Sequence, residues 1–210
     1  MDVQVGGATA GEVPSCARVI AAALRDDAVV RSLVPGGHDR FARLTAVYAA
    51  AVRMALAGRG VVDVARDGPH GPVVGVAMWE GPDHSPGGWP LLRELPGLVR
   101  AVGVRHLPAC ARALRSFAAL RPRYPHWFLA DVATEPTARG HGVGSALLAH
   151  RLAVVDATGL PAYLESTTAA SRRLYERFGF RATGTVRLPG AAATAMVRPA
   201  APEGGGAADR

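Results

Sequence analysis

Apolar residues recur with two different spacings along this chain, and the spacing assigns each segment to a helix or a strand. Positions three and four apart mark one face of a helix, whereas alternating or short continuous runs mark strands. The N-terminal pattern predicts an edge strand, two helices and a β-hairpin, in that order, at residues 3–5, 12–24, 41–57 and 61–79. The segment 26–40 between the two helices is rich in turn-forming residues and is predicted to be a link.

A long insertion, residues 81–126, follows the hairpin and opens with a loop rich in Pro and Gly. Its apolar residues then recur at helical spacing around the breakers Pro96, Gly97 and Pro108, which predicts two short helices. Long excursions beside a site often shape binding, so this insertion could be a substrate cover. A purely structural cover over the sheet is the other interpretation, and the pattern favours neither.

The segment from Trp127 to Ser166 has the order strand, glycine-rich turn, helix, strand. An apolar run starts at Trp127, and Pro136 forbids its continuation as a strand. After the glycine-rich turn, helical spacing extends over 144–155, and a second apolar strand follows at 162–166. Links this short imply a β-α-β crossover, in which the two strands are parallel.

The remaining C-terminal pattern predicts a short helix at 171–178, closed by Gly179 as a left-handed cap, and a final hairpin within 180–198. The tail 199–210 is rich in Ala, Gly and Pro and is predicted to be disordered. Strands and helices thus alternate over residues 1–198. This order predicts a single domain of the α/β class with a central mixed sheet.

Length and composition indicate a single soluble domain. The chain has 210 residues, of which 49% are hydrophobic, and no uninterrupted apolar run has membrane-spanning length. The N-terminus lacks a basic region followed by an apolar core, so no secretory signal is predicted and we expect a cytoplasmic protein without membrane contact. Cys16 and Cys110 are far apart, and no two histidines have ligand-type spacing, so no metal site is predicted.

The formal charge of +7 by itself points toward nucleic acid. However, all 24 basic residues are arginine, and they are spread along the chain without a dense basic run interleaved with aromatic residues. A solvated basic surface explains this distribution, so nucleic acid is not the expected partner. The same positive field would attract a small polyphosphorylated ligand.

The turn from Arg139 to Ser145 has the composition of a phosphate site. Unpaired N–H groups and the helix dipole favour an anion at the first turn of a helix. Glycines at 142 and 144 leave room for phosphate oxygens, and Arg139 and Ser145 can add donors. An ordinary glycine-rich surface loop is the alternative. The buried strand before it and the apolar helix after it favour the phosphate site.

Two motifs resemble the GNAT family of N-acetyltransferases. Arg139, Gly142 and Gly144 match the pattern Arg/Gln-x-x-Gly-x-Gly/Ala that forms the acetyl-CoA pyrophosphate loop of that family. Residues 174–180, LYERFGF, resemble the family's Tyr-x-x-x-Gly-Phe helix end and lie one strand after the loop, as they do in the family. The resemblance implies a GNAT-like acyl-CoA N-acyltransferase fold and an acetyl-CoA-dependent acetyltransferase. It implies acetyl-CoA as co-substrate and no metal.

By the same resemblance, the acetyl-CoA contacts come from the end of the strand, the glycine-rich turn and the last helix. The residues concerned are Val132, Ala133, Thr134, Arg139, Gly140, His141, Gly142, Val143, Gly144, Ser145 and Ser171. A backbone N–H near Val132 or Ala133, where the family's strand bulges, would stabilise the oxyanion of a tetrahedral intermediate. Ser171 stands where the family commonly has Asn, so one amide contact would be replaced by a hydroxyl.

Amine acetylation needs a base and an acid. Glu165, at the C-terminal end of a buried strand, is the best candidate for accepting the proton of the amine, directly or through a water chain, with Asp131 and Glu135 as weaker candidates. A solvated strand-end carboxylate is the alternative for Glu165. Tyr175, in the family position, would protonate the leaving thiolate. Packing of its ring as an aromatic anchor is the alternative role.

Three functions therefore compete. The first is acetylation of a primary amine on a small molecule, such as an aminonucleoside or another antibiotic-like amine, by direct attack of the amine. The second is acetylation of a protein N-terminus or lysine, and the third, least favoured, is a basic nucleic-acid-binding module. As an enzyme the protein is expected to be a monomer or a homodimer.

Overall fold

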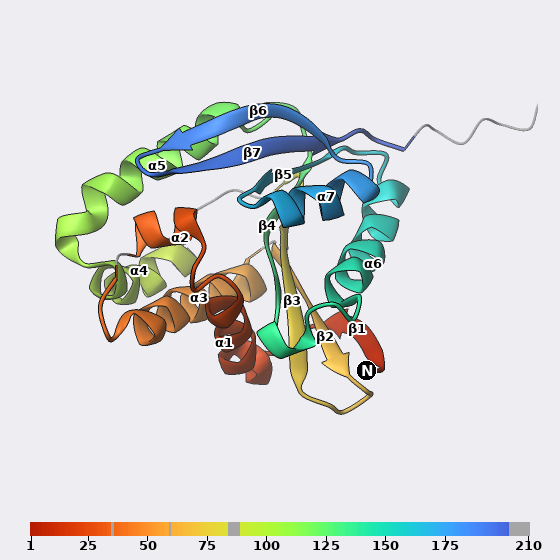
Figure 1. The fold of residues 1–210 in the computed structure, drawn as a ribbon, viewed down its shortest axis with the longest axis horizontal. Coiled ribbons are helices and arrows are strands. Elements are labelled where there is room, and N and C mark those ends of the chain that lie inside the picture. The colour runs from red at the N-terminus through yellow and green to blue at the C-terminus, as the bar shows by residue number, and fades with distance from the viewer. Residues whose placement is uncertain (35, 59, 84–88, 202–210) are drawn as a thin grey trace, which may run out of the picture.

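A mixed seven-stranded sheet is the centre of the computed structural model, which describes residues 1–201 except 35, 59 and 84–88. The strand order is β1-β2-β3-β4-β5-β7-β6, and only β4 and β5 are paired in parallel (Figure 1). The strands are β1 (Val3–Gly7), β2 (Gly60–Asp67), β3 (Val73–Glu80), β4 (Trp127–Thr134), β5 (Ala162–Ser166), β6 (Arg181–Leu188) and β7 (Ala191–Arg198). The predicted mixed sheet and parallel crossover are confirmed.

Helices cover both faces of this sheet. They are α1 (Val13–Ala23), α2 (Ala28–Leu33), α3 (Arg40–Ala57), α4 (Trp89–Val102), α5 (Leu107–Leu120), α6 (Val143–Ala157) and α7 (Ala169–Arg177). One apolar core joins α1 and α3 to one face, and a second core joins α6 and α7 to the other (Figure 1). Within the described part of the chain, no helix is both long and apolar enough to cross a membrane.

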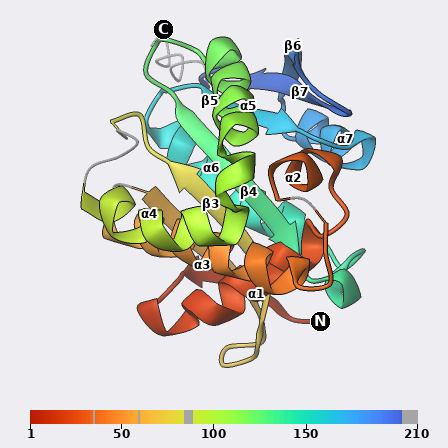
Figure 2. The ribbon, with the colours of Figure 1, turned by 90° about the vertical axis from the view of Figure 1, so that its left-hand side faces the viewer.

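The insertion forms two helices that are longer than predicted. Helix α4 runs through Pro96 and Gly97, so the prediction that these residues interrupt the helix is wrong. Packing outweighs their poor helix propensity, because α4 lies along α3 and Arg53 holds Glu94 with two hydrogen bonds of 2.8 and 2.6 Å. Helix α5 packs against β6, and Figure 2 shows α4 and α5 in front of the sheet.

The predicted link 26–40 contains a short helix that the sequence pattern did not show. Asp27 caps this helix, α2, because its side chain accepts hydrogen bonds from the backbone N–H groups of Val29 and Val30 at 2.9 and 3.0 Å. Helix α7 likewise begins earlier than predicted, at Ala169, because Thr168 caps it. Gly179 has the predicted left-handed conformation, with φ of 84°. Most of the predicted tail, residues 202–210, lies outside the described residues.

Helix α6 is fixed to the sheet by a close approach and by a buried ion pair. A Cβ at Gly75 of β3 would lie 2.4 Å from Cγ1 of Val143, the first residue of α6, so only glycine permits this spacing. Further along the helix, Arg151 binds the completely buried Asp63 of β2, with Nε 2.8 Å from Oδ2. The two contacts hold α6 against β3 and β2.

Candidate active site

The paired strands β4 and β5 separate after three residue pairs. Trp127, Phe128 and Leu129 pair with 162–164, and beyond Leu129 this edge of β4 has no strand partner among the described residues. On its other side β4 stays paired with β3 as far as Thr134. Backbone groups of the second half of β4 are therefore available to something other than a strand. The C-terminal ends of parallel strands are where open α/β sheets bind ligands.

A bulge at Ala130 accompanies this separation. Met78 of β3 pairs with Asp131 and Trp79 pairs with Leu129, so Ala130 has no partner in β3. The irregularity expected near Val132 and Ala133 thus lies two residues earlier. It places Asp131 opposite Met78 and so on the α1/α3 face of the sheet, whereas regular alternation from Leu129 would have placed it on the α6 face.

The glycine-rich turn has the backbone that a phosphate site needs. Gly140 and Gly142 have φ of 82° and 79°, and no heavy atom lies within 4 Å of a Cβ built on either one. Gly142 is the N-cap of the 15-residue helix α6, and Val143 is buried beneath it. Open space thus lies over the positive end of a helix, an arrangement that fits a pyrophosphate group.

The other residues of the predicted loop differ from one another in exposure and in their contacts. Gly144 does not have positive φ, and a Cβ there would be in ordinary contact with Leu174, at 3.5 Å. Arg139 is exposed, and its Nη2 donates to the carbonyl oxygen of Ala23 at the end of α1, at 3.1 Å. His141 is exposed and Ser145 is half-buried. The loop is therefore tied to the end of α1 as well as to α6.

Carboxyl groups gather on the α1/α3 face where β4 and β5 separate. The pKa of Asp131 is raised to about 7, first by burial and then by the neighbouring carboxyl groups of Asp27, Glu80 and Glu165. Burial likewise raises the pKa of Glu165 to about 7, with the Tyr163 hydroxyl and the Arg121 guanidinium opposing the shift. Both groups can therefore take up or release a proton near neutral pH.

Tyr175 lies on α7 next to this group. Its side chain is 6% exposed and packs edge-to-face on Phe180, with ring centroids 6.0 Å apart. Burial raises the pKa of its hydroxyl well above the ordinary value, and the carboxyl group of Asp131 adds to the shift. Tyr175 is therefore a neutral phenol that can donate a proton, and it is also a core residue.

Ser171 is engaged within the start of α7. Its hydroxyl lies 2.8 Å from the hydroxyls of both Ser166 and Thr168, and Thr168 rather than Ser171 is the N-cap. Ser171 is the third residue of this capping box. Its side chain is thus committed to local hydrogen bonds, while its position at the helix start agrees with the sequence prediction.

Three residues near the carboxyl groups were not found from the sequence. Glu80 ends β3 and pairs with Phe128, and Arg121 binds Glu80 and lies 3.8 Å above the Phe128 ring. Asp27 of the α1–α2 connection also faces Asp131 electrostatically. The alternation of β3 could have placed Glu80 on this face, but nothing local to the sequence indicated Arg121 or Asp27. Glu135, a weaker candidate, lies past the end of β4 and is not among the groups that shift the pKa of Asp131 or Glu165.

Within the described residues, no group of three or more His, Cys, Asp or Glu side chains is arranged to hold a metal ion.

Comparisons with known proteins agree with this geometry. The model of the acetyltransferase (GNAT) family matches residues 65–180. A histone acetyltransferase HPA2 and related acetyltransferase from Corynebacterium glutamicum is 34% identical, with TM-score 0.76 over 97% of this chain and 99% of that one. The ribosomal-protein-S18-alanine N-acetyltransferase of Escherichia coli is 16% identical, with TM-score 0.56 over 97% of each chain.

A third structure has the same fold with its ligand bound. The PaiA N-acetyltransferase of Thermoplasma acidophilum, in complex with coenzyme A, has TM-score 0.57 at 9% identity over 95% of this chain and 99% of that one. The family model covers the sequence from β2 to the end of α7, which includes the glycine-rich turn, both separating strands and Tyr175. This chain therefore belongs to the GNAT family of acetyltransferases, enzymes that use acetyl-CoA.

Proposed function

We propose that this acetyltransferase transfers the acetyl group of acetyl-CoA to a primary amine of a small molecule. The observation that carries the proposal is the pair of carboxyl groups, Asp131 and Glu165, with pKa values of about 7 beside the buried Tyr175. An amine attacks a thioester only as its free base, and a carboxyl group of this pKa can accept the proton at neutral pH. The acceptor we favour is an aminonucleoside or another antibiotic-like amine.

Glu165 is the proposed base. An alkylamine with the ordinary pKa of about 10.4 is almost entirely protonated at pH 7, so binding must be followed by loss of a proton. Negative charge at Glu165, Asp131 and Glu80 favours entry of the cationic amine. Because these carboxyl groups are coupled, the proton is shared within the group, and a water chain can carry it from the amine to Glu165.

Acetyl-CoA would be held by the glycine-rich turn and by the free edge of β4. The N–H groups at Gly142 and in the first turn of α6 would bind the pyrophosphate of acetyl-CoA. Because the pyrophosphate and the acetyl group belong to one molecule, this contact would help to position the acetyl group. An N–H of the unpaired edge near Val132 or Ala133 would donate to the oxygen that becomes negative during attack. Tyr175 would then give its proton to the departing thiolate, in concert with departure because the phenol is the weaker acid.

A small-molecule acceptor is supported by a sequence likeness. The segments at 125–136, 160–169 and 174–180 resemble puromycin N-acetyltransferase, an enzyme of the same family. In the structure two of these segments contribute the stacked rings of Phe128 and Tyr163, with centroids 5.9 Å apart, next to the carboxyl groups. Tyr163 is completely buried, so of the two rings only the half-buried Phe128 could contact an aromatic amine, beside the Arg121 guanidinium.

Acetylation of a protein amine is the second candidate. The C. glutamicum protein with 34% identity is described as a histone acetyltransferase HPA2 and related acetyltransferase, which favours a protein substrate. We expect either reaction to take place in the cytoplasm and the enzyme to act as a monomer or homodimer. Neither candidate involves nucleic acid or a membrane.

Release of free thiol from acetyl-CoA tests the proposal. The purified protein is incubated with acetyl-CoA and a panel of amines that includes puromycin, simple aminonucleosides, lysine peptides and peptides with free N-termini. We expect turnover with at least one small amine to exceed turnover with every peptide. Turnover with peptides alone would establish the second candidate, and salt-sensitive DNA binding without any thiol release would contradict both.

A further inference from the structure

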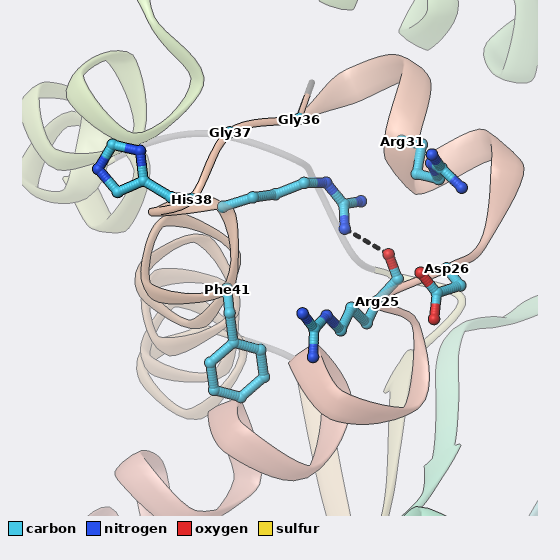
Figure 3. Close-up of a pocket in the computed structure, with 8 residues that line it drawn as sticks. Arg25, Asp26, Arg31, Gly36, Gly37, His38 and Phe41 are labelled. Atoms are coloured by element: carbon cyan, nitrogen blue, oxygen red, sulfur yellow. Dashed lines mark hydrogen bonds between the residues drawn. The ribbon is translucent and has the colours of Figure 1, made fainter.

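A small polar cavity of about 170 Å³ lies between the α1–α2 connection and the start of α3. None of the proposed catalytic residues lines it. Figure 3 shows Arg25, Asp26 and Arg31 on one side of it and the segment Gly36-Gly37-His38 on the other. Arg40, the first residue of α3, also lines the cavity. Pockets for whole drug-sized ligands are about 300–1,000 Å³, so this one can take only a small group.

Arg40 is an unusual residue for such a position. It is 9% exposed, its Nε donates to the carbonyl oxygen of Val34 at 2.8 Å, and its Nη1 donates to that of Arg25. Its Nη2 is buried and has no hydrogen-bond partner. Buried polar atoms are nearly always satisfied, and an unsatisfied cationic donor is especially costly. An anion bound in the cavity would offer an acceptor to this Nη2.

The charge of the residues that line the cavity also favours an anion. Three arginines and one carboxylate residue, Asp26, line the cavity, and among the described residues no carboxylate lies within ion-pair distance of Arg25, Arg31 or Arg40. Burial lowers the pKa of Arg40, and repulsion by Arg31, Arg25 and Arg43 lowers it further, while Asp26 opposes the shift. The positive end of the 18-residue helix α3 also points here.

We propose that Arg25, Arg31 and Arg40 form a binding site for one tetrahedral oxyanion, such as a phosphate group. Arginine is suited to this because its planar donors match two oxygens at once. The buried Nη2 of Arg40 would gain its acceptor, and the mutual repulsion of the three cations would be relieved. No residue proposed for acetyl transfer takes part.

The site adjoins the proposed catalytic group through α2. Asp26 lines the cavity, and the next residue, Asp27, caps α2 and acts electrostatically on Asp131. The oxyanion can therefore come from two sources, a phosphate group on the acceptor or a free anion that orders the α1–α2 connection. Both sources use the same chemistry, and they differ in whether the anion is attached to the amine.

Titration with inorganic phosphate tests the site directly, without acetyl-CoA. Binding is measured by calorimetry at constant ionic strength for the wild type, Arg25→Gln and Arg31→Gln. These two arginines are exposed, so their replacement should leave the fold intact, whereas Arg40 holds two carbonyl groups. Arg187→Gln is the matched control, because Arg187 is an exposed arginine of a second cavity, which Arg31 also lines and Arg25 does not.

We expect saturable binding of phosphate by the wild type and by Arg187→Gln, and at least about tenfold weaker binding by the other two variants, as for loss of one charge-assisted hydrogen bond. Absence of saturable binding by the wild type, or equal weakening in all three variants, would overturn the proposal.

A second experiment identifies the source of the anion and rests on the proposed acetyl transfer. Turnover of O-phosphoethanolamine is compared with that of ethanolamine, in the wild type and in Arg31→Gln. A preference for the phosphorylated amine that Arg31→Gln abolishes places the anion on the acceptor. Saturable phosphate binding without such a preference assigns the site to a free anion. Failure of turnover with every amine would count against the proposed function and leave the phosphate titration as the test of the site.

Discussion

The carboxyl group of Asp131 and the hydroxyl of Tyr175 interact electrostatically where β4 and β5 separate, and each belongs to a different part of the sequence. Asp131 faces the α1/α3 side of the sheet after the bulge, whereas Tyr175 belongs to the core on the α6 side. The two groups therefore interact although they come from opposite faces of the sheet. In the proposed reaction, a carboxyl group such as Asp131 is a candidate base and Tyr175 is the acid.

Tyr175→Phe should slow single-turnover acetyl transfer by about 10²–10⁴-fold, the usual contribution of general-acid catalysis. The ring and its packing on Phe180 are kept, so the melting temperature should change little. Both quantities are measured on the same protein, since slow product release could conceal the defect in steady state. Full-rate transfer by a normally folded variant would show that Tyr175 is only an anchor of the core.

Glu165→Gln should change the pH dependence of acetyl transfer. The carboxyl group accepts a proton only when ionised, so the wild-type rate should rise with pH through about 7. The variant should lose most activity near neutral pH and recover in part at alkaline pH, where more of the amine is a free base. A pH–rate profile for kcat/KM measures this. A variant with the wild-type rate and profile would assign Glu165 to structure.

Asp131→Asn should stabilise the protein at alkaline pH. The pKa of Asp131 is about 7 in the folded state against 3.8 ordinarily, so the folded state binds the proton more tightly and wild-type stability falls as pH rises between about 4 and 7. An asparagine side chain does not ionise, so the free energy of unfolding of the variant does not fall in this way. We expect a gain on the order of 1–3 kcal/mol in the free energy of unfolding at pH 8 and almost none at pH 4. Denaturant titrations at both pH values measure it, and a gain independent of pH would contradict the assignment.

Gly142→Glu should remove the stabilisation that acetyl-CoA gives to the folded protein. A side chain at φ of 79° costs about 1–2 kcal/mol, and the new carboxylate would occupy the proposed pyrophosphate site. Gly159→Glu is the control, since Gly159 follows the other end of α6 with φ of 64° and similar open space. Thermal shift with and without acetyl-CoA compares them. Equal cofactor-induced shifts in both variants would show that the turn does not bind the pyrophosphate.

Arg151→Met should destabilise the fold by about 3–5 kcal/mol, because it leaves the completely buried Asp63 without its two hydrogen bonds. Combining it with Asp63→Leu should recover most of the loss, since no charge is then buried. His150→Gln is expected to have little effect, because His150 is 3.8 Å from Asp63 and more exposed. Urea denaturation of the wild type, Arg151→Met, Asp63→Leu, the double variant and His150→Gln measures these values, and additive effects of the two single changes would contradict the coupling.

The sequence predicted the strands well because their apolar runs are bounded by glycine and proline. It missed α2, whose six residues are too few to show a helical period and which depends on one cap, Asp27. It also divided α4 at Pro96, where packing on α3 overrides local preference. These errors concern helices whose stability comes mainly from tertiary contacts.

For the candidate site, the sequence predicted the glycine-rich turn, Glu165 and Tyr175, because each belongs to a local pattern, and their roles stay predictions. The position of Asp131 relative to the other carboxyl groups depends on the bulge at Ala130, which reverses the alternation of β4, and a bulge leaves no reliable mark in a single sequence. Arg121 and Glu80 meet only through the fold, since they belong to different elements.

The absence of a side chain at Gly75 has a consequence for how this enzyme can change. A methyl group added at Gly75 would lie 2.4 Å from Cγ1 of Val143 and 3.0 Å from Cδ1 of Leu147, so the start of α6 would have to shift or repack, and the glycine-rich turn directly precedes it. We therefore expect a substitution at Gly75, within β3, to alter acetyl-CoA affinity without any change in charge or in the turn itself. Any related sequence with a larger residue at this position would need a smaller one at Val143 or Leu147, so these three positions should vary together.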